Sequence, residues 1–237
     1  MPSKYSLEVC AFNLQSSLVA ERVGAVRVEL CADVQQGGTT PSYGLIKTVR
    51  ETVGLALFPI IRPREGDFFY TEDEMSIMHR DIELCRELGC DGISIGVLQR
   101  NGEIDTERMK RIVEWAGTMA VTCHRAFDVT PDPFRALEDL ISCGCQRILT
   151  SGQKAKAVDA IDLLSRLVRA AGDRISIMPG GGLRAANISL LTATGASEFH
   201  SSARVAPEAD SIDMGLIGAG SFYIADEQEL RQMMAQL

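Results

Sequence analysis

The chain has 237 residues, 46% of them hydrophobic and 24% charged, a balance typical of an ordinary globular domain that excludes collagen-like and low-complexity classes. The net charge of −8 argues against broad nucleic-acid binding, which relies on clustered lysines and arginines. The longest apolar stretch, 53–61, is far shorter than the ~18 residues of a membrane span, and 1–10 lacks the apolar region of a secretory signal, so we expect a cytoplasmic protein without membrane contact.

One local pattern recurs along the chain at intervals of roughly thirty residues, about the length of one strand and one helix. A helical stretch ends, a glycine follows, and a short apolar run begins a few residues later. Glycine suits this position because the residue after a helix commonly takes a left-handed conformation. The glycines in the pattern are Gly24, Gly54, Gly89, Gly117, Gly144, Gly172 and Gly195. With a leading run at 7–10, they predict strands at 7–10, 26–30, 55–61, 93–95, 119–123, 148–149, 175–178 and 198–200.

Helix-start signals precede several of the segments between these strands. Thr71 and Glu74 have the spacing of a capping box, and Asp132 precedes Pro133 at a first helical position. The predicted strands are short and mostly apolar, as is typical when both faces of a sheet are buried.

Eight strand–helix units in a chain of this length predict an α/β fold, namely a closed (β/α)8 barrel of the TIM type. The chain has no linker or charge run that would divide it, so we expect a single barrel domain over 1–237. Within this domain we expect a long loop at 201–225, after the last strand, and a C-terminal helix at 226–237.

Cys10 and Cys31 end the first two predicted strands, each two residues after a glutamate (Glu8 and Glu29). In each strand the glutamate and the cysteine therefore point to the same side. Because neighbouring strands lie ~4.8 Å apart, the two thiols can meet at the working face of the barrel, where a pair of sulfur ligands suits Cu(I). The alternative is that each cysteine is a small core residue.

The other cysteines are interpreted as structural. Cys85, Cys90, Cys143 and Cys145 fall near the ends of predicted helices, and Cys123 should face away from the side of its strand that His124 occupies. A chain expected in the cytoplasm with an odd number of cysteines, seven, predicts reduced thiols rather than disulfides.

A second group of polar residues at the strand ends predicts an anion site. Glycine-rich loops after the seventh strand let backbone N–H groups approach phosphate oxygens, and arginines add matching donors. The alternative is that the glycines merely form tight turns and the arginines pair with glutamates at the barrel mouth. The residues predicted to bind the anion are Arg62, Arg64, Arg125, Ser151, Gly180, Gly181, Gly182 and Ser201.

If the protein is an enzyme, Glu8, Glu29, His124 and Asp128 are the candidates for acid–base catalysis. No lysine lies on a predicted strand, which disfavours a Schiff-base aldolase. The aromatic loop at 66–70 is a candidate lid over a ligand.

Segments at the predicted strand ends resemble the CutC family, the copper homeostasis proteins. The resemblance implies a TIM-type barrel, a cytoplasmic location, a role in copper tolerance or trafficking, and Cu(I) binding by two rim cysteines that correspond to Cys10 and Cys31. The matching segments are 8–10, 29–31, 37–42, 61–64, 66–68, 124–128, 148–152, 178–182 and 198–201.

Our leading hypothesis is a cytoplasmic copper homeostasis protein that binds Cu(I) through Cys10 and Cys31, with Glu8 and Glu29 as neighbouring groups. The alternative is an enzyme that acts on a small phosphorylated or carboxylated substrate by acid–base chemistry. A third interpretation is a scaffold that associates through its C-terminal segment. The expected partners are a copper ion, a small anionic ligand and further copies of the chain, with neither nucleic acid nor membrane.

Overall fold

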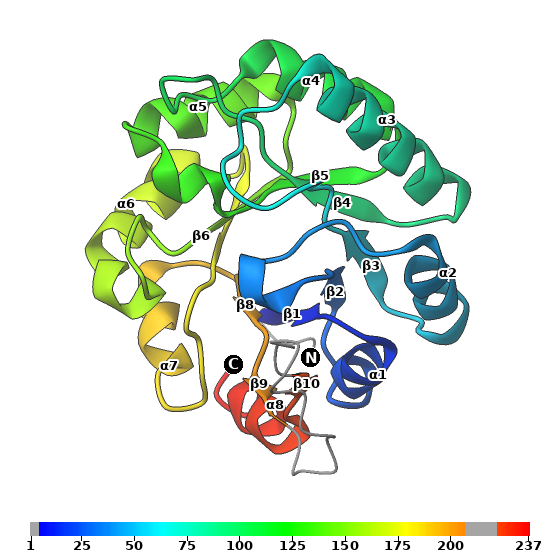
Figure 1. Ribbon diagram of the computed structural model, residues 1–237. Helices are drawn as coiled ribbons and strands as arrows, with labels where there is room; N and C mark the ends of the chain where they lie inside the picture. Colours follow the sequence, from blue (N-terminus) through cyan, green and yellow to red (C-terminus); the bar gives the residue numbers. More distant parts are fainter. Residues whose placement is uncertain (1–4, 207–221) are drawn as a thin grey trace, which may run out of the picture.

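The protein forms a ring of parallel strands surrounded by helices, as seen in the computed structural model (Figure 1), which describes residues 5–206 and 222–237. Each predicted strand is confirmed to within a few residues. The strands of the ring are β1 (Ser6–Ala11), β2 (Arg27–Leu30), β3 (Ala56–Pro59), β4 (Gly92–Ile95), β5 (Ala120–Cys123), β6 (Arg147–Thr150), β7 (Ser176–Pro179) and β8 (Glu198–Ser201).

The hydrogen bonds between strands close this ring into a barrel. Four strands pair in the order β3-β2-β1-β8, and the other four pair in the order β4-β5-β6-β7. Single parallel bridges join the two halves, one between Ile60 and Ser94 and one between Gly180 and His200. The predicted (β/α)8 barrel is therefore confirmed, and its closure places β8 directly beside β1.

The helices cover the outside of the barrel (Figure 1). The α-helices are α1 (Leu14–Arg22), α2 (Tyr43–Thr52), α3 (Glu72–Glu87), α4 (Thr106–Ala116), α5 (Pro133–Cys143), α6 (Ile161–Ala171), α7 (Ile188–Leu191) and α8 (Glu227–Met234). Short 3-10 helices are η1 (Val34–Gln36), η2 (Arg125–Val129), η3 (Ala157–Ala160) and η4 (Thr192–Thr194).

The helix-start signals are confirmed. Thr71 and Glu74 form a complete capping box at the start of α3, and the Asp132 side chain accepts from the first backbone N–H groups of α5. Gly54 departs from the predicted left-handed turn, because its φ is not positive. Its N–H instead donates to the Glu21 carboxylate at 2.6 Å, and a Cβ would meet that same oxygen at 3.2 Å.

The interior of the barrel is charged at its N-terminal end, in contrast to the mostly apolar strands expected. The Arg27 side chain of β2 donates to Glu8 of β1 and, at 2.6 Å, to Glu198 of β8. Arg147 of β6 reaches the same Glu198 carboxylate at 2.7 Å. The apolar core lies outside the barrel, between the strands and the helices; its strand residues include Val9, Val28, Ile93, Val121, Ile148 and Phe199.

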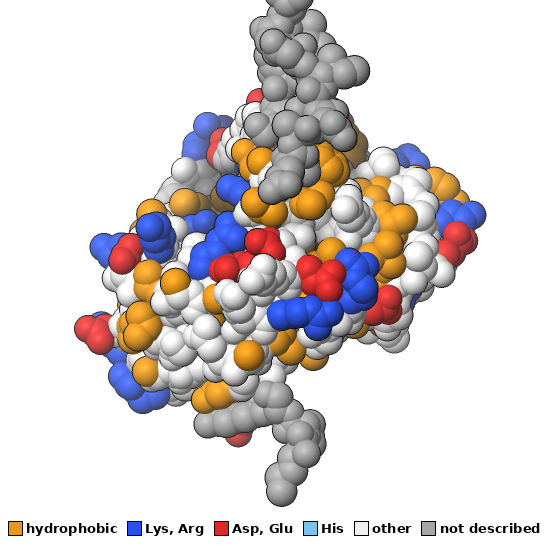
Figure 2. Space-filling view, turned by 90° about the horizontal axis from the view of Figure 1, so that it is seen from below, with side chains coloured by type: hydrophobic (Ala, Val, Ile, Leu, Met, Phe, Trp, Pro, Cys, Tyr) orange, Lys and Arg blue, Asp and Glu red, His pale blue; other side chains and the backbone are white. Residues whose placement is uncertain are grey.

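After β8 the chain forms β9 (Arg204–Val205), which pairs antiparallel with β10 (Ile224–Ala225) before α8 begins. The predicted 201–225 loop therefore contains strand pairing at both ends, and its central part, 207–221, lies outside the described residues. An ion pair between Arg22 and Glu227 (2.8 Å) links α1 to α8. On the face in Figure 2, acidic and basic side chains lie next to one another rather than in separate patches. None of the helices in 5–206 and 222–237 has both the length and the apolar character needed to span a membrane.

Candidate functional site at the mouth of the barrel

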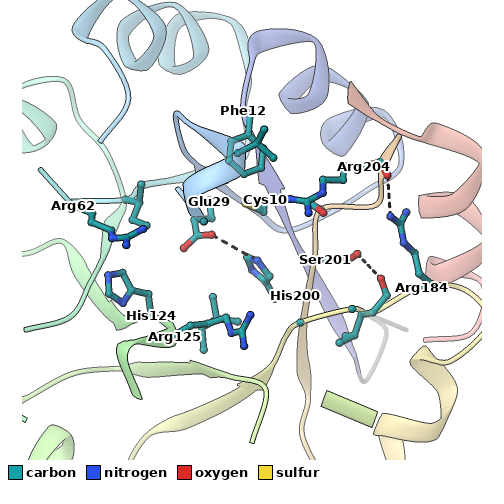
Figure 3. A pocket seen from close by; sticks show the side chains of 18 of the residues that line it. Cys10, Phe12, Glu29, Arg62, His124, Arg125, Arg184, His200, Ser201 and Arg204 are labelled. Atoms are coloured by element: carbon teal, nitrogen blue, oxygen red, sulfur yellow. Dashed lines mark hydrogen bonds and ion pairs between the residues drawn. The ribbon is translucent and has the colours of Figure 1, made fainter. Parts of the chain in front are cut away.

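A cavity of about 300 Å³ opens at the C-terminal ends of the strands (Figure 3). Residues from the ends of β1, β2 and β8 form its middle, and the loops after β3, β5 and β7 form its sides. Eight residues of the sequence-predicted site line this cavity. They are Cys10, Glu29, Arg62, His124, Arg125, Gly181, Gly182 and Ser201.

The two predicted thiols are brought together. The Sγ atoms of Cys10 and Cys31 lie 3.8 Å apart. In the register between β1 and β2, Cys10 pairs with Glu29. The Cys31 N–H donates to the carbonyl of Ala11, the residue after Cys10. Cys10 is half-buried and faces the cavity, whereas Cys31 is fully buried behind it.

His200 of β8 completes a cluster that the sequence reasoning missed. Ligand atoms of Cys10, Glu29 and His200 all lie within 4.8 Å of one another. The Nδ1 atom of His200 is 2.7 Å from the Glu8 carboxylate, and its Nε2 atom is 3.6 Å from Glu29. The available signal was the alternation of Glu198 and His200 along β8, but its use required knowing the register in which β8 pairs with β1.

Glu8 holds His200 rather than lining the cavity. Burial alone would raise the pKa of Glu8, but the hydrogen bond to His200 and the charge of Arg27 lower it to about 2. Burial would lower the pKa of His200, yet its hydrogen bonds to Cys10 and Glu8 raise that pKa well above the usual value. The pair is therefore an ionised carboxylate that fixes the orientation of an imidazolium ring, and Glu8 is a poor proton donor at neutral pH.

The two thiols have opposite tendencies to ionise. A hydrogen bond from Cys31 lowers the pKa of Cys10 to about 5, whereas burial raises the pKa of Cys31 well above its usual value. Burial, together with the Cys10 charge, also raises the pKa of Glu29 to about 8. At neutral pH the cluster therefore contains one thiolate, at Cys10, which accepts from the Cys31 thiol.

Arg62 and His124 form one side of the cavity (Figure 3). Arg62 is 6% exposed and donates to the carbonyls of Gln36, Gly38 and Gly66, so it holds two loops in place. The His124 Nδ1 atom accepts from the Ala126 N–H at 3.1 Å. The centre of the Phe68 ring lies 5.0 Å from the centre of the His124 ring and 5.0 Å from the central guanidinium carbon of Arg62. The predicted aromatic loop thus contacts the site through Phe68.

Several predicted site residues do not line the cavity. Arg64 donates to Glu74 at the start of α3 and to the Phe69 carbonyl, so it anchors the aromatic loop. The Asp128 carboxylate accepts from Thr150 and Ser151 and pairs with Arg125 at 2.8 Å, so its oxygens are already engaged.

Gly180 and Ser151 pack beneath the cavity instead of lining it. A Cβ on Gly180 would lie 2.4 Å from Leu149, which explains the glycine by close packing. The Ser151 hydroxyl accepts from Arg125 at 2.8 Å and supports that side chain. Two arginines that the sequence reasoning did not select, Arg184 and Arg204, line the opposite side of the cavity (Figure 3).

Comparison with known proteins adds the family context. The model of the CutC family matches residues 5–205. A family protein CutC from Parabacteroides distasonis is 55% identical over 203 residues, covering 85% of this chain and 84% of that protein. Another from Xanthomonas campestris pv. campestris is 51% identical over 199 residues, covering 84% and 83%. A protein from Streptococcus agalactiae whose crystal structure is named as copper homeostasis protein CutC is 35% identical in sequence to this chain. The two structures match with a TM-score of 0.80, over 84% of this chain and 98% of that one.

Proposed function

The chain belongs to the CutC family of copper homeostasis proteins, and from this premise we propose that it binds one Cu(I) ion through Cys10 and Cys31 at the mouth of the barrel. The observation that carries the proposal is the 3.8 Å separation of the two Sγ atoms. Two metal–sulfur bonds of ~2.3 Å each can bridge any distance up to ~4.6 Å, so one ion can bind both sulfurs without movement of the strands. Thiolates are the ligands that Cu(I) prefers.

His200 is the proposed third ligand. Its Nδ1 atom is engaged by Glu8 at 2.7 Å, so the Nε2 atom is the one directed to the cluster. Metal-binding histidines commonly have their second ring nitrogen held by a carboxylate in this way, which fixes the orientation of the ring. In this proposal Glu8 acts on the metal through His200, as a neighbouring group.

The route to the proposed site runs through the cavity. Cys10 faces the cavity and is the half-buried member of the thiol pair, so an incoming ion meets this thiolate first. Cys31 and the Nε2 atom of His200 then each lose a proton to become ligands, so binding releases protons to solvent. Seven free thiols suit a reducing compartment, and the proposal accordingly includes a cytoplasmic location. Self-association of the chain stays a prediction.

The donor set also allows a competing ion. Cys10, Glu29 and His200 supply one sulfur, one oxygen and one nitrogen, a combination that Zn²⁺ accepts. The two ions differ in their need for Cys31, since it belongs to the sulfur pair proposed for Cu(I) and not to the cluster of three. A Cys31→Ser variant therefore separates the two cases.

The proposal is tested by anaerobic competition titration of the protein with Cu(I). We expect one tightly bound equivalent in the wild type and its loss in the double variant Cys10→Ser, Cys31→Ser. The matched control is Cys143→Ser, Cys145→Ser, which removes two buried thiols distant from the cavity and should retain the equivalent. Circular dichroism checks that both variants are folded. Equal Cu(I) affinity in the two double variants, or a Zn²⁺ affinity that exceeds that for Cu(I) and survives Cys31→Ser, contradicts the proposal.

A further inference from the structure

The cavity has more cationic donors than a copper site uses. Arg62, Arg125, Arg184 and Arg204 all line it, while Glu29 is the carboxylate among its lining residues. Among the described residues, Arg62, Arg184 and Arg204 form no ion pair with a carboxylate. Guanidinium groups repel a metal cation but match the oxygens of phosphate and carboxylate groups, so these arginines indicate a second ligand of opposite charge.

Two buried donors on one side of the cavity lack partners. The Arg62 Nε atom and the His124 Nε2 atom have no hydrogen-bond partner among the described residues, although the two residues are only 6% and 4% exposed. Because His124 Nδ1 accepts from Ala126, a neutral ring has its proton on Nε2. Burial and the charge of Arg62 lower the pKa of His124 to about 3, so the ring is neutral and Nε2 is a donor. Buried donors without acceptors are rare in native proteins, which points to an acceptor on a ligand.

The opposite side of the cavity has free backbone donors. Gly182 and Ser202 line the cavity after β7 and β8, and within the described residues their N–H groups make no hydrogen bond. Gly182 has a φ of +73°, a conformation that glycine adopts without strain and that brings the backbone close to a ligand. The loops after the seventh and eighth strands are where barrels of this kind commonly bind phosphate. Arg184 and Arg204 lie on this same side (Figure 3).

We propose that the cavity binds a small phosphorylated metabolite that has a carboxylate at its other end. The phosphate accepts from the Gly182 and Ser202 N–H groups beside Arg184 and Arg204. The carboxylate accepts from Arg62 Nε and His124 Nε2 on the facing side. A volume of about 300 Å³ limits the ligand to a few heavy atoms between these two groups.

This anion site is independent of the proposed copper site, although Cys10 faces the same cavity. None of the donors assigned to the anion is a thiol or His200. The two proposals therefore fail separately: loss of both cysteines should remove Cu(I) binding and should not weaken anion binding. The proposed anion site also favours the enzyme interpretation, because Glu29 and His124, two of the candidates for acid–base catalysis, line the same cavity.

The test is isothermal titration calorimetry of the metal-free protein with phosphoglycolate, inorganic phosphate and glycolate as probes. We expect phosphoglycolate to bind at least ten-fold more tightly than either of the others, because it alone engages both sides of the cavity. Arg184→Met should weaken both phosphate-containing probes. Arg62→Met should weaken phosphoglycolate at least ten-fold and leave inorganic phosphate unchanged. Since Arg62 also holds two loops, His124→Phe is a second variant. It leaves Arg62 in place and removes the Nε2 donor, together with the Nδ1 acceptor of the Ala126 N–H.

The matched control is Arg174→Met, which removes an exposed arginine that pairs with Glu138 and does not line the cavity. It should bind phosphoglycolate as the wild type does, and Cys10→Ser, Cys31→Ser should bind it at least as tightly. The proposal is overturned if phosphoglycolate gives no heat at millimolar concentration, or if Arg174→Met weakens it as much as Arg62→Met and His124→Phe do.

Discussion

Replacing His124 by asparagine should make the stability of the protein less sensitive to acid between pH 7 and pH 5. The His124 side chain is 4% exposed, and its Nδ1 atom accepts from the Ala126 N–H at 3.1 Å. An asparagine oxygen can accept from the same N–H, so the substitution removes the titrating ring and retains the backbone hydrogen bond. The loss of contact with Phe68 lowers the stability of the variant at every pH and does not affect the comparison between pH values.

The size of the effect follows from the pKa of His124, which burial and the charge of Arg62 lower from 6.5 to about 3. Below pH 6.5 the unfolded chain binds a proton that the folded chain excludes, so the free energy of unfolding falls as the pH falls, until pH 3. pH 5 lies 1.5 units below 6.5, the pKa of the ring in the unfolded chain, and this difference lowers the free energy of unfolding by about 2 kcal/mol. Other groups titrate equally in both proteins, so wild type should lose about 2 kcal/mol more than His124→Asn.

The assay is urea denaturation of both proteins at pH 7 and pH 5, in buffers free of phosphate and carboxylate anions so that no ligand stabilises the cavity. The four unfolding curves give the loss of stability from pH 7 to pH 5 for each protein, and hence the difference between the two losses. Equal losses of stability in wild type and His124→Asn would show that the ring titrates normally. The neutral Nε2 donor assigned to the anion site would then be wrong as well.

Three further predictions concern the barrel and its thiols. Gly92→Ala should lower the free energy of unfolding by about 2 kcal/mol or more, because a Cβ would lie 2.3 Å from the Phe58 ring. Gly44→Ala should raise it by about 0.5–1 kcal/mol, because a Cβ at this position of α2 meets open space. Equal urea midpoints for the two variants would contradict this. Arg27→Met should cost about 3 kcal/mol, because it removes a buried guanidinium from two carboxylates and leaves Glu8 with His200 and Glu198 with Arg147. An unchanged melting temperature would refute the stabilising role of this residue. Iodoacetamide should modify Cys10 first, since it is the half-buried thiol and its pKa is lowered to about 5; peptide mass spectrometry that finds another cysteine modified first would exclude this reactivity.

Most of the fold could be predicted from local signals in the sequence. The glycine after a helix, the capping box at Thr71 and the proline after Asp132 depend on residues close together in the chain. All of these recur in the structure, except that Gly54 does not take the left-handed conformation. The charged interior around Arg27 and Glu198 was not predicted, because it depends on which strands face each other across the barrel. Alternation along a strand separates its two faces but does not say which face is inward.

The site was predictable in part, for the same physical reason. Cys10 lies on β1 and Cys31 directly follows the adjacent β2, so the approach of the two thiols follows from strand spacing, and their Sγ atoms lie 3.8 Å apart. The predicted closed barrel already implies that β8 lies beside β1, but the register between these strands, which sets His200 level with Glu8, does not follow from the linear sequence. Arg62 and Arg64 are indistinguishable by position, yet the Glu74 carboxylate of α3 draws Arg64 away from the cavity. Which of two neighbouring arginines faces a ligand depends on contacts from distant segments.

Copper X-ray absorption spectroscopy of the protein loaded anaerobically with one equivalent of Cu(I) identifies the metal's ligands themselves. We expect a single ion bound by the sulfurs of Cys10 and Cys31 together with one nitrogen from His200. Cys31→Ser should lose one sulfur from the spectrum, and Cys143→Ser should leave it unchanged. A wild-type spectrum with no sulfur bound to copper, or one that Cys10→Ser and Cys31→Ser leave unaltered, would contradict the account.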